Sequence, residues 1–221
     1  MADMDLFPLY LTIKVSLIAT LFVAVIGIAI AYLLARRDFL GKNFLDALIL
    51  LPLVLPPTVT GYYLIVFFGK TGIIGKYIYS FTGWSVAFTW QAAVLASIIV
   101  AMPFMIKTAR AAIESVNIEL EKVAYTLGKS EWETMLLVTL PLAKKGILAG
   151  IVLSFARATG EFGATLMFAG DIPGKTNTMP IAIYDAVSAG ELGTANLLVL
   201  ILTFVSISIL YLTNRLIQGR W

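Results

Sequence analysis

Arg157 and Glu161 are the residues whose chemistry stands out first, because both lie in a segment that is otherwise apolar. They are four residues apart, so in a helix they share one face and can form an ion pair. A charge in the middle of a bilayer costs at least ~2.5 kcal/mol even on lenient scales, so such groups usually serve a function. The pair predicts either part of a transport path or a structural link between spans. Gly146 and Gly150 on the same segment predict close contact with another helix.

A second group with special chemistry is the proline cluster in LPLVLPPTVTGYYL. Pro52, Pro56 and Pro57 lack a backbone N–H, so carbonyl groups one turn earlier lose their helix partners. Unpaired backbone at membrane depth is tolerated only where protein or a water-lined cavity satisfies it. With Thr58 and Gly61 following, the cluster predicts a transport path or gate. A kink used only for packing is the alternative.

The usual catalytic and metal-binding side chains are absent, because the 221 residues include no histidine and no cysteine. Three GKT or GKS triplets, at 69–71, 128–130 and 174–176, resemble the end of a phosphate-binding loop. None has the glycine five residues earlier that such a loop requires. A lone carboxylate held by a permanent cation, as Glu161 would be, is also a poor general base. We therefore expect no catalysis, no metal and no cofactor bound by this chain.

The elements that must position these residues are transmembrane helices. The chain is 60% hydrophobic and only 13% charged, whereas soluble domains are about 45–50% apolar. We predict an all-α integral membrane protein with five spans, each long enough to cross a core of ~30 Å. The predicted spans are Leu9–Ala35, Leu45–Phe68, Val86–Ile106, Gly146–Phe168 and Leu197–Ile217. The segment Ile181–Asn196 is too short to cross and predicts an external or partly re-entrant helix.

Lysine and arginine are distributed unequally between the two sides, and they accumulate on the cytoplasmic side of membrane proteins. One side holds Arg36, Arg37, Lys42, Lys107, Arg110, Lys122, Lys129, Lys144, Lys145, Arg215 and Arg220. The other side holds Lys70, Lys76 and Lys175, while Lys14 and Arg157 lie within spans. This bias predicts an N-terminus outside and a C-terminus in the cytoplasm.

One long stretch, Leu120–Lys145, cannot lie inside a bilayer, and the charge bias places it in the cytoplasm. Its first residues are apolar at helical spacing, and Gly128 follows where a helix C-cap favours positive φ. Ser130 and Glu133 have the spacing of a capping box that begins a second helix, and Pro141 predicts a further turn. The apolar faces of these helices comprise Leu120, Val123, Ala124 and Leu127, then Trp132, Met135, Leu136 and Thr139. We call this stretch the knob; it predicts a docking element, or alternatively a simple amphipathic connector.

The knob resembles the EAA loop of ABC-importer permease subunits. The shared positions are Ala124, Gly128 and the ending VTLP at 138–141. Lys122 stands at the family's usual acidic position with Glu121 one place earlier, and Val123 replaces the first alanine, as in molybdate-type members whose motif resembles LExxAxTLG. In that family the loop is a coupling helix seated in a cleft of the ATPase subunit. The resemblance implies coupling roles for Glu121, Ala124, Gly128, Ser130, Glu133, Leu140 and Pro141.

The segments GEFGATLMFAG and PIAIY, with the proline cluster, are similar to molybdate and tungstate permeases, so that the resemblance covers nearly the whole chain. It implies the type I ABC importer permease fold, with residues 1–221 as one membrane domain and 107–145 as its cytoplasmic coupling loop. The implied partners are a second copy of the chain, two cytoplasmic ATPase subunits that bind Mg–ATP, and an external oxyanion-binding protein, with no nucleic acid. The path or gate residues would be Pro56, Pro57, Thr58, Gly61, Arg157, Gly160 and Glu161. An external gate or docking surface would include Lys175, Asn177 and Thr178.

These features together predict the plasma or inner membrane subunit of an ATP-driven importer of molybdate or tungstate that works by alternating access. A sulfate or thiosulfate permease is the nearest alternative within the same class. An ion-coupled secondary transporter, with Arg157 and Glu161 as its coupling pair, is the alternative from another class. No similarity between the two halves of the sequence supports that second alternative.

Overall fold

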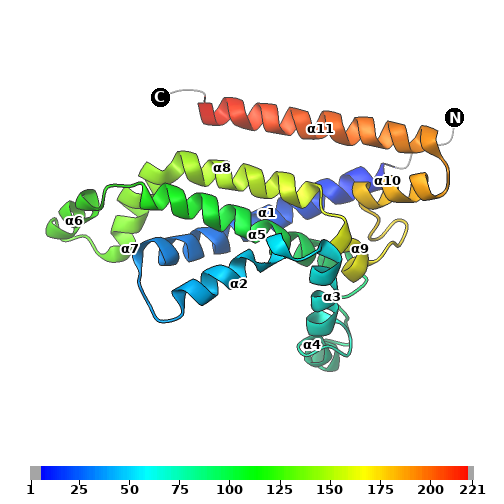
Figure 1. The fold of residues 1–221 in the computed structure, drawn as a ribbon, viewed down its shortest axis with the longest axis horizontal. Helices are drawn as coiled ribbons and strands as arrows, with labels where there is room; N and C mark the ends of the chain where they lie inside the picture. The colour runs from blue at the N-terminus through cyan, green and yellow to red at the C-terminus, as the bar shows by residue number, and fades with distance from the viewer. Residues whose placement is uncertain (1–5, 219–221) are drawn as a thin grey trace.

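The computed structural model describes residues 6–218, except for the side chains at 212–214 and 216–218. Every regular element in this range is a helix, which confirms the all-α prediction for the described part of the chain (Figure 1). In chain order the elements are α1 (Phe7–Arg36), α2 (Lys42–Val54), α3 (Pro57–Phe68), α4 (Gly75–Thr82), α5 (Trp90–Glu114), α6 (Ile118–Thr126), α7 (Glu131–Thr134), the π-helical turn η1 (Met135–Thr139), α8 (Leu140–Thr159), α9 (Gly163–Ala169), α10 (Met179–Ser188) and α11 (Leu192–Gln218).

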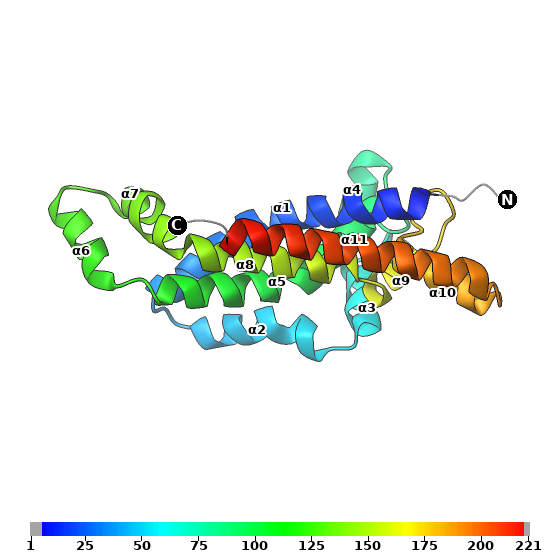
Figure 2. The ribbon, with the colours of Figure 1, turned by 90° about the horizontal axis from the view of Figure 1, so that it is seen from above.

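The core consists of α1, α5 and α8, which lie side by side along the long axis of the molecule (Figures 1 and 2). Small residues bring these helices together. A Cβ added to Gly146 on α8 would lie 2.3 Å from the Cβ of Ala112 on α5, and one at Gly150 would lie 3.1 Å from the sulfur of Met105. The predicted close helix contact is therefore confirmed. α11 lies along α8 on the outside of this core and leaves most of its apolar surface exposed.

Within the described residues, four helical stretches are long and apolar enough to cross a membrane, and α2 with α3 would make a fifth as a bent pair. The four are Phe7–Arg36, Trp90–Glu114, Glu131–Thr159 and Leu192–Tyr211. The boundaries of α5 differ from the prediction. Thr89 accepts the Ala92 N–H at 3.2 Å and so caps the start of the helix, which then continues beyond Ile106 to Glu114.

The second predicted span is broken. The chain bends by 117° between α2 and α3, so that α3 runs across the long axis of the bundle (Figure 1). Pro56 and Pro57 explain the break, because neither residue can donate the hydrogen bond that would continue α2. The predicted second span from Leu45 to Phe68 thus consists of two helices, and the predicted loss of helix hydrogen bonds at the proline cluster marks the break between them.

The fourth predicted span also ends early. α8 stops at Thr159, and the short helix α9 begins at Gly163 after a break at Gly160–Phe162. The backbone N–H of Ala164 in the first turn of α9 is bonded to the side chain of Glu161 instead of to a preceding helical carbonyl. The prediction of one helical span from Gly146 to Phe168 assumed that Arg157 and Glu161 share a helix face. Instead, Arg157 lies in α8 and Glu161 lies in the break that follows it.

α1 begins and α11 ends at opposite ends of the bundle, as an odd number of crossings requires (Figures 1 and 2). The knob lies at one end, together with Arg36 and Arg37 at the end of α1. α10 and the loop before it lie at the other end, where Lys14 of α1 places its ammonium 3.9 Å from the ring centre of Trp90. α10 is a short helix, but the predicted segment Ile181–Asn196 is divided: α10 ends at Ser188, and the last apolar helix begins at Leu192. Arg220, which contributed to the predicted orientation, lies outside the described residues.

Candidate functional site

The knob folds as the local sequence predicts. Asn117 caps α6 by accepting the Glu119 N–H at 3.0 Å, and Gly128 adopts φ +80° immediately after that helix. Ser130 and Glu133 form a complete capping box: the Ser130 hydroxyl accepts the Glu133 N–H, and the Glu133 carboxylate accepts the Ser130 N–H at 2.9 Å. The predicted helix–glycine–helix is therefore confirmed in its geometry.

Pro141 does not turn the chain, contrary to the prediction. α7, η1 and α8 run together as one apolar helical stretch from Glu131 to Thr159, and Pro141 lies in the first turn of α8. A proline inside a helix removes one backbone donor and pushes its ring against the carbonyl one turn earlier. The π-helical turn Met135–Thr139 ends two residues before Pro141, and its wider hydrogen-bond spacing accommodates that disruption. Leu140 and Pro141 thus lie within this continuous helical stretch.

The predicted apolar faces of the knob divide into two sets. Ala124, Met135 and Thr139 are buried, whereas Leu127 is 76% exposed and Trp132 is 66% exposed. Further exposed apolar side chains on the knob are Leu120, Val123, Tyr125, Leu136 and Leu137, and Ile118 just before the knob is exposed as well. An apolar surface of this kind is typical of a protein interaction site. Gly128 and Ser130 are also exposed and lie beside this surface, and Glu133 is partly exposed.

Glu121, predicted as a coupling residue, points into the protein. Its carboxylate forms an ion pair of 2.8 Å with Arg36 at the end of α1, and the side chains are only 4% and 11% exposed. Arg36 was counted in the sequence only as one of the cytoplasmic cations. The two residues are 85 positions apart, so no local spacing could have paired them. Arg36 is a site residue that the sequence interpretation missed.

The two predicted path segments, one around Pro57 and one around Glu161, are brought together. α3 packs against α9 through glycine on each side: a Cβ on Gly61 would lie 2.9 Å from the carbonyl oxygen of Ala164, and one on Gly163 would lie 2.9 Å from the Cβ of Pro57. Neither position accepts a larger residue without displacing the neighbouring helix. The structure therefore places Pro57, Thr58 and Gly61 against the helix that follows Glu161.

Arg157 and Glu161 form the predicted ion pair, at 2.7 Å. The Glu161 side chain is 1% exposed, and its other carboxylate oxygen accepts the Ala164 N–H at 2.7 Å. The Arg157 side chain is 26% exposed, so it remains partly accessible to a ligand. Gly160, at the end of α8, is exposed as well.

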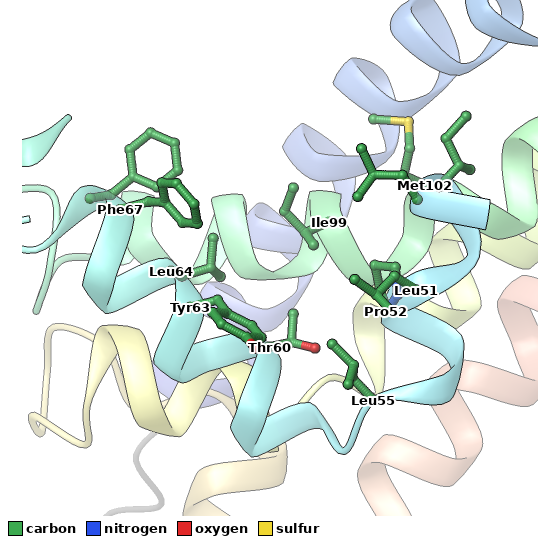
Figure 3. Close-up of a pocket in the computed structure, with 12 residues that line it drawn as sticks. Leu51, Pro52, Leu55, Thr60, Tyr63, Leu64, Phe67, Ile99 and Met102 are labelled. Carbon is green, nitrogen blue, oxygen red and sulfur yellow. The ribbon is translucent and has the colours of Figure 1, made fainter. Parts of the chain in front are cut away.

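A cavity of about 480 Å³ occupies the elbow between α2 and α3, as Figure 3 shows. Its lining is apolar, with Pro52, Leu55, Tyr63 and Met102 among the contributors. Thr60 provides a hydroxyl whose Oγ1 is buried without a hydrogen-bond partner in the described part of the chain. Among the described residues that line this cavity none is charged, so it is unsuited to an oxyanion, but it leaves room for the angle of the elbow to change.

The loop before α10 is held by polar side chains. Asn177 donates to Asp171 at 2.7 Å and to Asp185 of α10 at 3.1 Å. Burial raises the pKa of Asp185 to about 6, and the neighbouring Asp171 carboxyl acts in the same direction, while Asn177 opposes it. Thr178 is buried at the start of α10, and Lys175 is exposed. Asn177 therefore connects this loop to α10.

A bundle of apolar helices, a broken second span and a knob with an exposed apolar surface at one end are together typical of a class of membrane transport proteins. Residues 17–220 match the family of binding-protein-dependent transport system inner membrane components, and the chain belongs to this family. It is therefore a component of a membrane transport system and not an enzyme, as predicted.

The chain is 45% identical to the molybdenum transport system permease protein ModB of Escherichia coli K12 over 90% of its length and 88% of that protein's. It is 43% identical to ModB of Haemophilus influenzae, over 94% and 91% of the two chains. It is 44% identical to the putative molybdenum transport system permease protein YvgM of Bacillus subtilis, over 83% and 81%.

Two solved structures share the fold at low sequence identity. The MetNI methionine ABC transporter in an inward-facing conformation aligns with a TM-score of 0.74 at 17% identity, covering 96% of this chain and 94% of that one. A bacterial ABC transporter that imports alginate aligns with a TM-score of 0.79 at 16% identity, covering 99% and 80%. The predicted fold of ABC importer permeases is thereby confirmed.

Proposed function

We propose that this chain is the membrane-spanning subunit of an ATP-driven importer of molybdate. The observation that carries the proposal is its 43–45% identity, over most of its length, to permeases named for molybdenum transport. Tungstate, an oxyanion of the same shape and charge, is a second substrate of the same path. Selection between such anions belongs mainly to the external binding protein.

The proposed assembly contains two copies of this chain, two cytoplasmic ATPase subunits that bind Mg–ATP, and an external oxyanion-binding protein. Its alginate-transporting fold neighbour is known in complex with a ligand-bound periplasmic protein, which supports a partner of this type. The lysine and arginine bias supports an N-terminus outside and a C-terminus inside. Residues 1–221 then form one permease domain, with the coupling loop at 107–145 in the cytoplasm.

In this assembly the knob passes motion between the ATPase and the spans. The exposed apolar surface that includes Leu127 and Trp132 supports docking in an ATPase cleft. ATP-driven closure of the two ATPase subunits moves the knobs, and the dimeric cavity opens outward to accept the anion. The apolar elbow between α2 and α3 supports a gate there, because its cavity allows the bend to open and close.

Arg157 supplies the positive charge for the anion on this path. The guanidinium of this partly exposed side chain can meet a passing oxyanion by charge-assisted hydrogen bonds. Glu161 reduces the attraction, which suits a path that must release its cargo. The outer loop with Lys175, Asn177 and Thr178 lies near the opposite end of the bundle from the knob, where a binding protein would dock.

The test is co-purification of the tagged chain from membranes of its native host, with mass spectrometry of the bound proteins. We expect an ATPase subunit at one copy per permease, lost when the apolar knob residues Leu127 and Trp132 are both changed to serine. Uptake of labelled molybdate, tungstate and sulfate into vesicles then ranks the substrates. A preference for sulfate would mean that the importer transports sulfate and not molybdate. Transport by the chain alone without ATP would establish an ion-coupled carrier instead.

A further inference from the structure

We infer that Arg36, Glu121 and Thr139 form a brace that makes the knob and the membrane end of α1 move as one body. These residues are positioning residues, because they act on the path through the helices that they connect. The inference rests on the proposed function, in which the knob receives the motion of an ATPase. It assigns to Glu121 a role different from direct contact with that ATPase.

The brace converges on a single carboxylate oxygen. Oε1 of Glu121 accepts the Arg36 Nε–H at 2.9 Å, lies 2.8 Å from the second guanidinium nitrogen, and accepts the Thr139 hydroxyl at 2.8 Å. The same Arg36 nitrogen donates to the carbonyls of Ile113 at 2.8 Å and Val116 at 3.1 Å. Four segments therefore meet here: the end of α1, the end of α5, α6 and the π-helical turn.

The π-helical turn presents Thr139 to this carboxylate. A π-turn contains one more residue than an α-helical turn, and one residue rotates the following side chains by about 100° around the helix axis. Thr139 is the last residue of this turn and is fully buried. π-turns inside α-helices are frequently found at functional sites. The local helix irregularity and the buried ion pair thus coincide at one point.

Stability alone does not account for such a pair. The desolvation of two charges offsets much of their attraction, and apolar replacements of similar size are often equally stable or more stable. What an ion pair with fixed hydrogen bonds adds is one defined geometry between the segments that it joins. Close by, Arg37 and Glu131 form a second ion pair whose side chains are 58% and 46% exposed. Exposed pairs of this kind contribute little, so this pair is a matched control.

The test uses the complete transporter, purified with its ATPase subunits and binding protein and reconstituted in vesicles. The measured quantity is the ATP hydrolysed per molybdate imported. Changing both braced residues, Arg36→Met with Glu121→Met, leaves no unpaired buried charge, so the chain is expected to assemble. We expect this double variant to bind the ATPase normally but to use about tenfold more ATP per molybdate, within the usual range of coupling between linked sites.

Three further variants separate the brace from a general loss of structure. Arg37→Met with Glu131→Met should leave the ratio within about twofold of the wild type, as expected for an exposed pair. Glu121→Gln, which keeps the shape but leaves Arg36 without its charge partner, should raise the ratio, and Arg36→Lys should raise it less. A wild-type ratio in the assembled Arg36→Met, Glu121→Met variant would overturn the inference. A wild-type chain that binds no ATPase would instead overturn the proposed function.

Discussion

Within the described residues, two arginine–glutamate pairs with a buried carboxylate look alike but are built differently. In both pairs the carboxylate is almost inaccessible, at 4% exposure for Glu121 and 1% for Glu161. Arg36 comes from another helix, 85 residues away, and its guanidinium also bonds to backbone carbonyls at the end of α5. Arg157 lies four residues from Glu161, which in turn caps the start of α9.

The two pairs differ in how far the arginine is bonded to other groups and how far it remains accessible to a ligand. The Arg36 guanidinium is bonded to one carboxylate and two carbonyl groups and is only 11% exposed, so it is suited to holding segments together. Arg157 is 26% exposed and bonds locally, so it can still meet a ligand. A buried ion pair therefore indicates a function only when the remaining donors of its cation are known. We assign the first pair to force transmission and the second to the anion path.

The largest effect is expected from the second pair. Arg157→Leu removes the charge offered to the anion and leaves Glu161 buried without its partner, which is strongly destabilising for a buried pair. We expect molybdate uptake to fall by about a hundredfold, corresponding to ~3 kcal/mol. Labelled molybdate uptake, normalised to the amount of assembled transporter, measures this.

Lys76→Leu is the control for that variant, because Lys76 is an exposed cation on α4 that lies 5.0 Å from the ring centre of Tyr77. Its uptake should stay close to that of the wild type. Glu161→Gln separates the two roles of this carboxylate. Glutamine still presents an oxygen to the Ala164 N–H, but it carries no charge to pair with Arg157. Equal losses in Arg157→Leu and Lys76→Leu would remove Arg157 from the path.

The next effect tests the knob without touching either ion pair. Gly128 has φ +80°, a conformation that a β-branched residue adopts only under strain of about 1–3 kcal/mol. Gly128→Val should therefore displace the docking turn and raise the ATP used per molybdate by about tenfold while the spans stay assembled. Gly83 has φ +69° and equally open surroundings at the end of α4, so Gly83→Val imposes the same strain far from the knob. An unchanged ratio in Gly128→Val would count against the docking hypothesis.

Features held by neighbouring residues could be predicted from the sequence. The capping box of Ser130 and Glu133, the positive φ of Gly128 and the pairing of Arg157 with Glu161 each depend on residues within four positions of each other. The helical class and the apolar segments followed from composition and run length. These patterns therefore predicted the fold and one of the two ion pairs.

Features that depend on distant contacts could not be predicted. The partner of Arg36 is set by how α1, α5 and α6 pack together, and sequence spacing carries no signal for it. The prolines marked a break in the second span, but the angle of 117° depends on α3 packing against α9. Likewise, Pro141 predicted a turn, because nothing local shows that a π-helical turn would carry the helix through it.

A smaller effect separates one donor of the Arg36–Glu121 brace from the rest. Thr139→Val keeps the side-chain shape but removes the hydroxyl that donates to Glu121 at 2.8 Å. A hydrogen bond to a charged group contributes about 1.5–3 kcal/mol, and Arg36 still holds the carboxylate. We therefore expect the ATP used per molybdate to rise about threefold, less than for Gly128→Val. Thr134→Val is the control. Thr134 is equally buried in the knob, but its hydroxyl has no partner in the described residues, so this variant should leave the ATP used per molybdate unchanged. Equal ratios in the two variants would exclude Thr139 from the brace.

The smallest effect concerns a third carboxylate, that of Asp185, which is partly buried and forms no ion pair within the described residues. Burial and the adjacent Asp171 carboxyl raise the pKa of Asp185 from 3.8 to about 6. A raised pKa means that the folded protein binds this proton more tightly than the unfolded chain. The stabilisation is therefore fully present below about pH 3.8 and is lost as the pH rises through about 6.

Lowering the pH from 7 to 5 should raise the melting temperature of the purified protein relative to Asp185→Asn, by about 2 °C. Asp38→Asn is the control, because the hydrogen bond from Lys42 lowers the pKa of Asp38 and so moves its titration below this range. A difference between wild type and Asp185→Asn that does not vary from pH 5 to 7 would show that Asn177 alone holds the loop, and that all three carboxylates are held by fixed donors.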